Sequence, residues 1–129
     1  MRETSGPARA AAGPTILVVE DEAMLLDVVA AELTDAGFRV LCAASAEEAD
    51  GILGAGTGID LLFTDIRLPG RLDGWDLAER ARARNPALPV IYVTGYSAEA
   101  PRQVSASVLV MKPYRPSAIV RVARQLGVG

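Results

Sequence analysis

The sequence has no histidine and a single cysteine, Cys42, among its 129 residues. A lone cysteine cannot form a disulfide within the chain. Without histidine or a cluster of cysteines, the chain can build neither a structural zinc site nor a histidine-based catalytic triad. Cys42 lies in an apolar segment, so we expect it to be a small buried side chain.

Long apolar runs and an excess of positive charge are also missing. No apolar stretch approaches the ~18 residues of a membrane-spanning helix, and residues 1–14 lack the apolar core of a signal peptide. The net charge is −3 and the sequence pI is about 4.9, which argues against a dedicated nucleic-acid surface because such a surface needs a positive field. We therefore expect a soluble cytoplasmic protein that binds neither nucleic acid nor a membrane.

The chain does have enough hydrophobic residues for a sizeable core. They make up 50% of a length that suits one domain. Residues 1–14 are rich in Ala, Gly, Pro and Arg and show no apolar periodicity, so we expect a disordered tail or a linker there. Residues 15–129 should form the domain.

Strand-like and helix-like patterns alternate along this domain. Short apolar runs predict strands at 15–19, 38–43, 59–65, 89–93 and 108–111. Apolar stripes predict helices at 23–36, 74–84 and 116–126, and a short helix that Ser45 and Glu48 begin with a capping-box signature. Because parallel strands need crossover connections, this alternation predicts a doubly wound α/β sandwich, with helices on both faces of a parallel sheet.

Two further segments, 74–84 and 97–106, differ in charge and in periodicity from the other predicted elements. The charged residues of the helix at 74–84 are most simply a solvated face. The segment 97–106 contains Pro101 and has weak periodicity, so any helix there should be short or irregular.

Polar residues end the predicted strands, and they carry the strongest functional signal. If the strands are parallel, one edge of the sheet collects Glu20, Asp21, Asp65, Thr94 and Lys112. Carboxylates without nitrogen or sulfur ligands suit Mg²⁺, while the lysine can bind an anion and the threonine can donate a hydrogen bond. This combination suits phosphoryl transfer onto Asp65. Each residue alone could equally be a turn residue, a helix cap or a solvated charge.

The ordered set of segments resembles the receiver domain of two-component response regulators, from about residue 15 to residue 126. The matching segments are residues 16–22, 61–65, 68–70, 73–74, 93–95 and 111–113. The resemblance implies a CheY-like, flavodoxin-like fold with five parallel strands in the order 2-1-3-4-5. It also implies that Asp65 accepts a phosphoryl group from a sensor histidine kinase.

The resemblance further implies a role for each site residue. Asp21, Asp65 and the backbone carbonyl of Arg67 would hold Mg²⁺, and Glu20 would act through a water molecule. Thr94 and Lys112 would contact the phosphoryl oxygens. The Lys112–Pro113 peptide is expected to be cis, as in the family, and to aim the lysine.

The sequence departs from the usual receiver pattern at three places. Leu109 stands where an aromatic switch residue is usual, the segment from Thr94 to Lys112 is short, and the loop 69–74 looks one residue longer than common. The segment 92–96, Tyr-Val-Thr-Gly-Tyr, is similar to the Phe-Ala-Thr-Gly-Tyr motif of a subgroup of single-domain regulators, which resemble partners of HWE-type histidine kinases. We therefore expect Tyr96 to take over the switch role by packing over the phosphorylated site, and a partly exposed loop aromatic is the alternative.

The function that we expect is a stand-alone phospho-acceptor, a monomer or weak dimer, that signals by changing its binding to another protein. It would not be an enzyme beyond self-catalysed phosphotransfer and autodephosphorylation. The expected contact surface on the last strand and helix surrounds Tyr114, Val120, Arg121 and Arg124. The alternatives are a Mg²⁺-dependent aspartyl-phosphate phosphohydrolase, an unphosphorylated protein-binding module, and a piece of a hybrid kinase.

Overall fold

A computed structural model describes residues 13–95 and 102–129. All five predicted strands are present, with ends that shift by one or two residues: β2 (Thr15–Val19), β3 (Arg39–Ala43), β4 (Leu61–Asp65), β5 (Val90–Thr94) and β6 (Ser107–Met111). The predicted helices are present as well: α2 (Ala23–Asp35), α3 (Ala46–Gly54), α4 (Gly74–Arg84) and α5 (Pro116–Gln125). None of the helices in these two ranges combines the length and the hydropathy needed to cross a bilayer.

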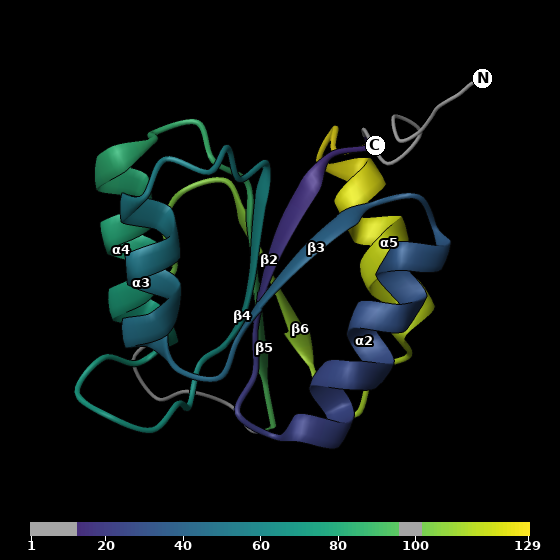
Figure 1. The fold of residues 1–129 in the computed structure, drawn as a ribbon, viewed down its shortest axis with the longest axis horizontal. Helices are drawn as coiled ribbons and strands as arrows, with labels where there is room; N and C mark the ends of the chain where they lie inside the picture. The colour runs from purple at the N-terminus through teal and green to yellow at the C-terminus, as the bar shows by residue number, and fades with distance from the viewer. Residues whose placement is uncertain (1–12, 96–101) are drawn as a thin grey trace.

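The strands form one parallel sheet in the order β3-β2-β4-β5-β6. Counted along the chain, this is the predicted order 2-1-3-4-5. Figure 1 shows the sheet as a central layer, with α2 and α5 covering one face and α3 and α4 covering the other. The doubly wound α/β prediction is therefore confirmed.

The core consists of two apolar layers, one on each face of the sheet. Along β2, Leu17 and Val19 belong to the layer beneath α3 and α4, while Ile16 and Val18 belong to the layer beneath α2 and α5. Successive side chains of a strand point to opposite faces, so a strand buried on both sides needs a continuous apolar run. This is why the central strands read as uninterrupted runs in the sequence.

Two predicted element ends differ in detail. The strand β4 begins at Leu61 rather than at Ile59, because Asp60 is used at the start of the sheet: its carboxylate accepts a hydrogen bond from the Thr15 backbone N–H at 2.8 Å. The α3 cap forms as expected, with Ser45 accepting from the Glu48 backbone N–H at 3.1 Å. The Glu48 carboxylate, however, turns back to the Ala44 N–H at 2.8 Å.

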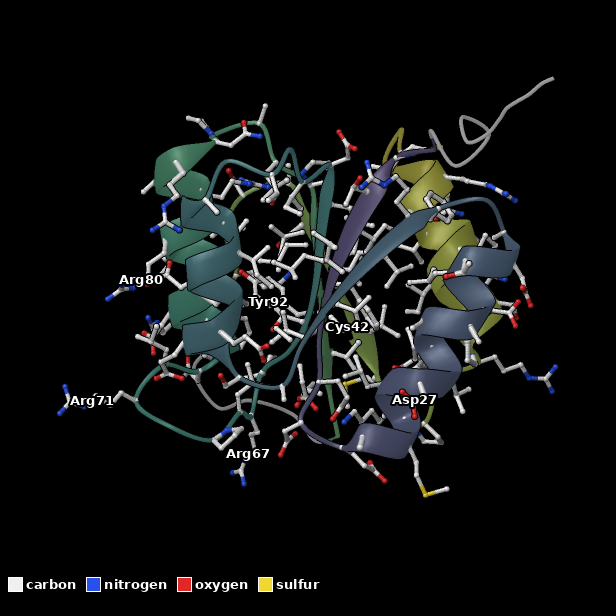
Figure 2. All side chains as sticks on the ribbon, viewed as in Figure 1. Asp27, Cys42, Arg67, Arg71, Arg80 and Tyr92 are labelled. Atoms are coloured by element: carbon white, nitrogen blue, oxygen red, sulfur yellow. The ribbon has the colours of Figure 1, made fainter. Side chains whose placement is uncertain are left out.

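The prediction that Cys42 is buried is wrong. Its thiol is exposed because β3 is an edge strand of the sheet. The side chains of this strand range from exposed to buried. Figure 2 shows Cys42 on this edge strand. Partial desolvation of the thiol, followed by the negative charges of Asp27 and Glu48, raises the pKa of Cys42 above its ordinary value.

The charged face of α4 is also more than a solvated surface. Arg80 and Arg84 bind Asp50 of α3 at 3.2 and 2.9 Å, which ties the two neighbouring helices together. On the other side of α4, Asp76 and Glu79 both bind Arg102, at 3.0 and 2.8 Å. These charges therefore connect neighbouring elements, although exposed ion pairs of this kind contribute little to stability because solvent screens them.

The described part of the irregular segment, residues 102–106, contains no helix. It ends in a turn at which Ala106 takes a left-handed backbone conformation, with φ of 54°. The rest of the predicted segment 97–106 lies outside the described residues.

Candidate functional site

The parallel sheet brings together the residues that the sequence analysis selected. Glu20 follows the end of β2, Asp65 ends β4, Thr94 ends β5, and Lys112 follows the end of β6. The register places Asp65 beside Val93, and Thr94 beside Met111. Residues far apart in the sequence therefore meet at the carboxyl edge of the sheet, where α/β folds of this type bind ligands.

Asp65 is the centre of this group. It is only 8% exposed, and both oxygens of its carboxylate have partners. The Oδ2 atom lies 2.6 Å from Lys112 Nζ, and the Oδ1 atom accepts a hydrogen bond from the Arg67 backbone N–H at 3.2 Å. The hydroxyl of Thr64 donates to the Asp65 backbone carbonyl at 2.8 Å. The carboxylate is thus held at the sheet edge in one orientation.

Lys112 connects two carboxylates across the site. Besides its short contact with Asp65, Nζ lies 3.4 Å from Oε1 of Glu20. Burial acts to lower the pKa of Lys112, but the hydrogen bond and charge of Asp65, with the charge of Glu20, outweigh it and raise the pKa above its ordinary value. The lysine therefore stays protonated and supplies a fixed positive charge beside Asp65.

Glu20 is a buried acid next to this lysine. Its second oxygen accepts a hydrogen bond from the Glu22 backbone N–H at 3.0 Å, and its side chain is 7% exposed. Burial raises the pKa of Glu20, and the negative charge of Asp65 adds to that effect, although the Glu22 hydrogen bond and Lys112 oppose it. A second positive charge would relieve the remaining repulsion between these acids.

The donor set fits a hard divalent cation. One carboxylate oxygen each from Glu20, Asp21 and Asp65 lies within 4.8 Å of the others, and Asp21 is exposed to solvent. Oxygen ligands at an open edge are what Mg²⁺ and similar cations prefer, because these cations keep part of their water shell. Arg67, whose backbone carbonyl was expected as a further ligand, lies in the adjoining loop and lines an open hollow together with Asp21, Pro69 and Asp73.

The remaining predicted residues surround this edge. Thr94 is buried at 3% exposure, and its backbone carbonyl accepts a hydrogen bond from the Lys112 N–H at 2.8 Å. The Lys112–Pro113 peptide bond is cis. Leu109 is half-buried and packs against the apolar layer beneath α3 and α4, where its neighbour across the strand pair is Tyr92. The switch residue expected at Tyr96 lies outside the described residues.

Part of the contact surface expected on the last helix is not on the surface. Val120 is only 8% exposed and belongs to the core beneath α2 and α5. Tyr114 is half-buried and packs edge-on against Phe63, with ring centroids 5.9 Å apart. Burial and the charge of Glu20 raise the pKa of Tyr114 to about 12. Arg121 and Arg124 are exposed, as expected.

Two residues that shape the loop after Asp65, Gly74 and Glu47, were not among the predicted site residues. A side chain at Gly74 would meet the Asp65 backbone oxygen at 2.2 Å, so only glycine allows α4 to start this close to the site. The Glu47 carboxylate on α3 accepts hydrogen bonds from the backbone N–H groups of Arg71 and Leu72, at 2.8 and 2.9 Å. These bonds lower the pKa of Glu47. The capping box between Asp73 and Asp76 then begins the helix.

Comparison with known proteins agrees with this geometry. The family described as "Response regulator receiver domain" matches residues 16–124. A response regulator receiver protein from Sinorhizobium medicae is 37% identical in sequence and superposes with a TM-score of 0.85, covering 89% of this chain and 94% of that one. The receiver domain of the hybrid histidine kinase CckA is 33% identical, with a TM-score of 0.76, over 87% of this chain and 97% of that one.

A curated relative, the transcriptional regulatory protein AruR of Pseudomonas aeruginosa, is 36% identical over an alignment of 121 residues, and the match covers 88% of this chain and 49% of that protein. The chain therefore spans about half the length of this relative. The chain belongs to the response regulator receiver domain family of two-component systems. A receiver domain implies a divalent metal site, and the cluster of Glu20, Asp21 and Asp65 is consistent with one.

Proposed function

We propose that this domain is a phosphorylation-controlled switch whose acceptor is Asp65. One observation carries the proposal. The Asp65 carboxylate lies 2.6 Å from the Lys112 ammonium at an open sheet edge, within a cluster of three carboxylates that a cation would complete. In this environment, the Lys112 ammonium and a bound cation would balance the negative charge that a phosphoryl group brings to Asp65.

The chemistry assigns a separate task to each side chain. An Asp65 oxygen attacks the phosphorus atom of the donor, a phosphorus–oxygen bond forms, and the bond from phosphorus to the kinase histidine nitrogen breaks. Lys112 pairs with a phosphoryl oxygen in place of the Asp65 oxygen that it now contacts, and the hydroxyl of Thr94 donates to another. Asp21, Asp65 and the carbonyl of Arg67, with Glu20 through water, would hold Mg²⁺, which supplies positive charge to the transferring group.

The reaction ends by hydrolysis in the same site. Water attacks the phosphorus atom, the bond to the Asp65 oxygen breaks, and inorganic phosphate leaves. We propose no enzymatic activity beyond this self-catalysed phosphotransfer and autodephosphorylation. The phosphorylated state would act by changing the affinity of β6 and α5 for another protein.

The phosphoryl donor proposed here is a sensor histidine kinase in the cytoplasm. HWE-type kinases are the first to try, because the segment 92–96 is similar to the motif of regulators that resemble their partners. The relative AruR is named as a transcriptional regulator, and CckA as a hybrid kinase. Receiver domains this similar thus occur in proteins with different outputs, and the downstream partner has to be found by experiment.

The decisive experiment is intact-protein mass spectrometry after incubation with acetyl phosphate and Mg²⁺. We expect the wild type to gain one phosphoryl group only when Mg²⁺ is present, and Asp65→Ala to gain none. Asp60→Ala is a suitable control, since this second aspartate lies at the opposite end of β4.

Two results would contradict the proposal. If Asp65→Ala still gains the group, the acceptor lies elsewhere. If neither acetyl phosphate nor a histidine kinase modifies the wild type, the domain is not a phospho-acceptor, and steady release of phosphate from small esters would instead indicate a phosphohydrolase.

A further inference from the structure

The loop between β4 and α4, residues 66–73, carries Arg67, whose backbone carbonyl is an expected metal ligand. The backbone fixes both ends of this loop. The Ile66 N–H donates to the Val93 carbonyl at 3.0 Å, and the Gly74 N–H donates to the Ile66 carbonyl at 2.8 Å. Between these ends the loop runs out beside the first turn of α3, as Figure 1 shows. The contacts of this outer part, residues 69–72, therefore influence the path of the whole loop.

Glu47, in the first turn of α3, binds the outer part of the loop. Its Oε2 atom accepts hydrogen bonds from the backbone N–H groups of Arg71 at 2.8 Å and Leu72 at 2.9 Å. Successive N–H groups that converge on one anionic oxygen form a concave site for it and fix the direction of the chain. The Leu72 side chain packs against the apolar layer beneath α3 and α4, so a polar and an apolar contact hold the same residue.

Gly70 gives the Glu47 carboxylate its access to these N–H groups. Its φ of 96° lies in the left-handed region, which favours glycine. A Cβ atom at this position would lie 2.7 Å from Oε1 and 3.0 Å from Oε2 of Glu47. Because the glutamate side chain is flexible, a side chain at position 70 would push its carboxylate away from the loop. The conformation and the size of Gly70 thus both suit the contact with Glu47.

The same loop forms one side of the acidic site. The Arg67 N–H donates to Asp65 Oδ1 at 3.2 Å, and Arg67 lines an open hollow together with Asp21, Pro69 and Asp73. A backbone carbonyl has no side-chain rotamer with which to adjust, so its place depends on the path of the loop. Groups that orient a ligand from outside the coordination sphere change metal affinity substantially.

We propose that Glu47 is a positioning residue for the cation site. Its carboxylate holds the outer part of the loop and thereby places the Arg67 carbonyl relative to Asp21 and Asp65. The carboxylates that come together at the sheet edge are Glu20, Asp21 and Asp65, so Glu47 acts on the site through the loop. This inference rests on the proposed function, in which these residues hold Mg²⁺.

The test is the Mg²⁺ dissociation constant of the 129-residue chain, measured by isothermal titration calorimetry at constant ionic strength. We expect Glu47→Ala to raise it by about tenfold, the lower end of the usual cost of losing an outer contact. Glu47→Asp keeps the charge but is one methylene too short for the contact, so it should also weaken binding. Glu47→Gln loses the charge but keeps an oxygen that accepts N–H donors, and it should stay close to the wild type.

Glu48→Ala is the matched control. This acid is the next residue of α3, and its carboxylate accepts from the Ala44 N–H instead of from the loop. The variant removes an equal charge and should leave the Mg²⁺ affinity unchanged. Gly70→Ala should weaken Mg²⁺ binding in the wild type and have a smaller effect in Glu47→Ala, because both changes remove the same contact.

Hydrogen exchange without Mg²⁺ tests the loop contact by itself. The amides of Arg71 and Leu72 should exchange faster in Glu47→Ala and keep their wild-type rates in Glu48→Ala. Unchanged exchange in Glu47→Ala would overturn the inference, and so would a wild-type Mg²⁺ affinity in that variant. A loss of affinity in Glu47→Gln but not in Glu47→Asp would show that only the charge acts, which also overturns it. A wild type that does not bind Mg²⁺ would contradict the cation site of the proposed function itself.

Discussion

Gly74 shows how a single residue sets the geometry around Asp65. Its backbone N–H donates to the Ile66 carbonyl at 2.8 Å, and a Cβ atom at this position would lie 2.2 Å from the Asp65 carbonyl oxygen and 2.7 Å from the Ile66 Cα. These backbone atoms cannot yield as a flexible side chain would. A methyl group here must therefore push α4 away from the end of β4.

We expect Gly74→Ala to destabilise the domain by about 1–3 kcal/mol, the usual cost of forcing extra volume into a packed site. Urea unfolding measures this change. Gly51→Ala is the matched control, since Gly51 lies within α3 with nothing near its missing Cβ. That control should be neutral or stabilising, because alanine favours helix over glycine. Equal losses of stability in both variants would show that the close approach between residue 74 and the Asp65 backbone is not the cause of the destabilisation.

At the level of elements, the described part of the connection into β6, residues 102–106, makes contacts with α4 and β5. The Tyr92 hydroxyl accepts a hydrogen bond from the Val104 N–H at 3.0 Å, and the Tyr92 ring packs on Trp75, with centroids 4.7 Å apart. Figure 2 shows Tyr92 between the sheet and the helices α3 and α4. Arg102 adds ion pairs to α4.

Tyr92→Phe removes the hydroxyl and keeps the ring. We expect a loss of about 1 kcal/mol in the free energy of unfolding, since the partly buried N–H of Val104 loses its acceptor. Hydrogen exchange gives the sharper readout: the Val104 amide should exchange faster, while amides in the middle of β2 should change only as much as global stability does. Unchanged exchange at Val104 would mean that this hydrogen bond does not hold the segment.

The elements also show what could be read from the sequence. Apolar runs and stripes gave all the strands and helices, because burial on both faces leaves a strong pattern in the order of residues. The site residues were found because each one ends a strand. The exposed Cys42, the ion pairs at Asp50 and the loop support from Glu47 were missed. They depend on which elements become neighbours, and only the folded sheet decides that.

Across the part of the molecule that the structure describes, five strands and four helices concentrate negative charge at one edge of the sheet, with Lys112 in its middle. The lysine and a divalent cation would both stabilise the same carboxylates, Glu20, Asp21 and Asp65. A bound cation should therefore compensate in part for the loss of the lysine charge, and the lysine for the loss of the cation. Without either, three acids whose carboxylate oxygens lie within 4.8 Å would repel each other, and solvent screens the buried pair Glu20 and Asp65 less than the exposed Asp21.

We expect Lys112→Met to lower stability by about 1–3 kcal/mol without a cation, less than for a fully buried pair because the lysine side chain is 27% exposed. Added Mg²⁺ should recover part of this loss and stabilise the variant more than the wild type, since a ligand that binds only the folded state stabilises by RT ln(1 + [L]/Kd). Urea unfolding with and without Mg²⁺ measures both effects. Asp21→Asn, combined with Lys112→Met, should reduce the response to Mg²⁺, whereas Lys112→Arg, which keeps the charge, should resemble the wild type. An equal Mg²⁺ response in the wild type and in Lys112→Met would show that the lysine and the cation do not share the carboxylates, and that the charge at this edge is balanced elsewhere.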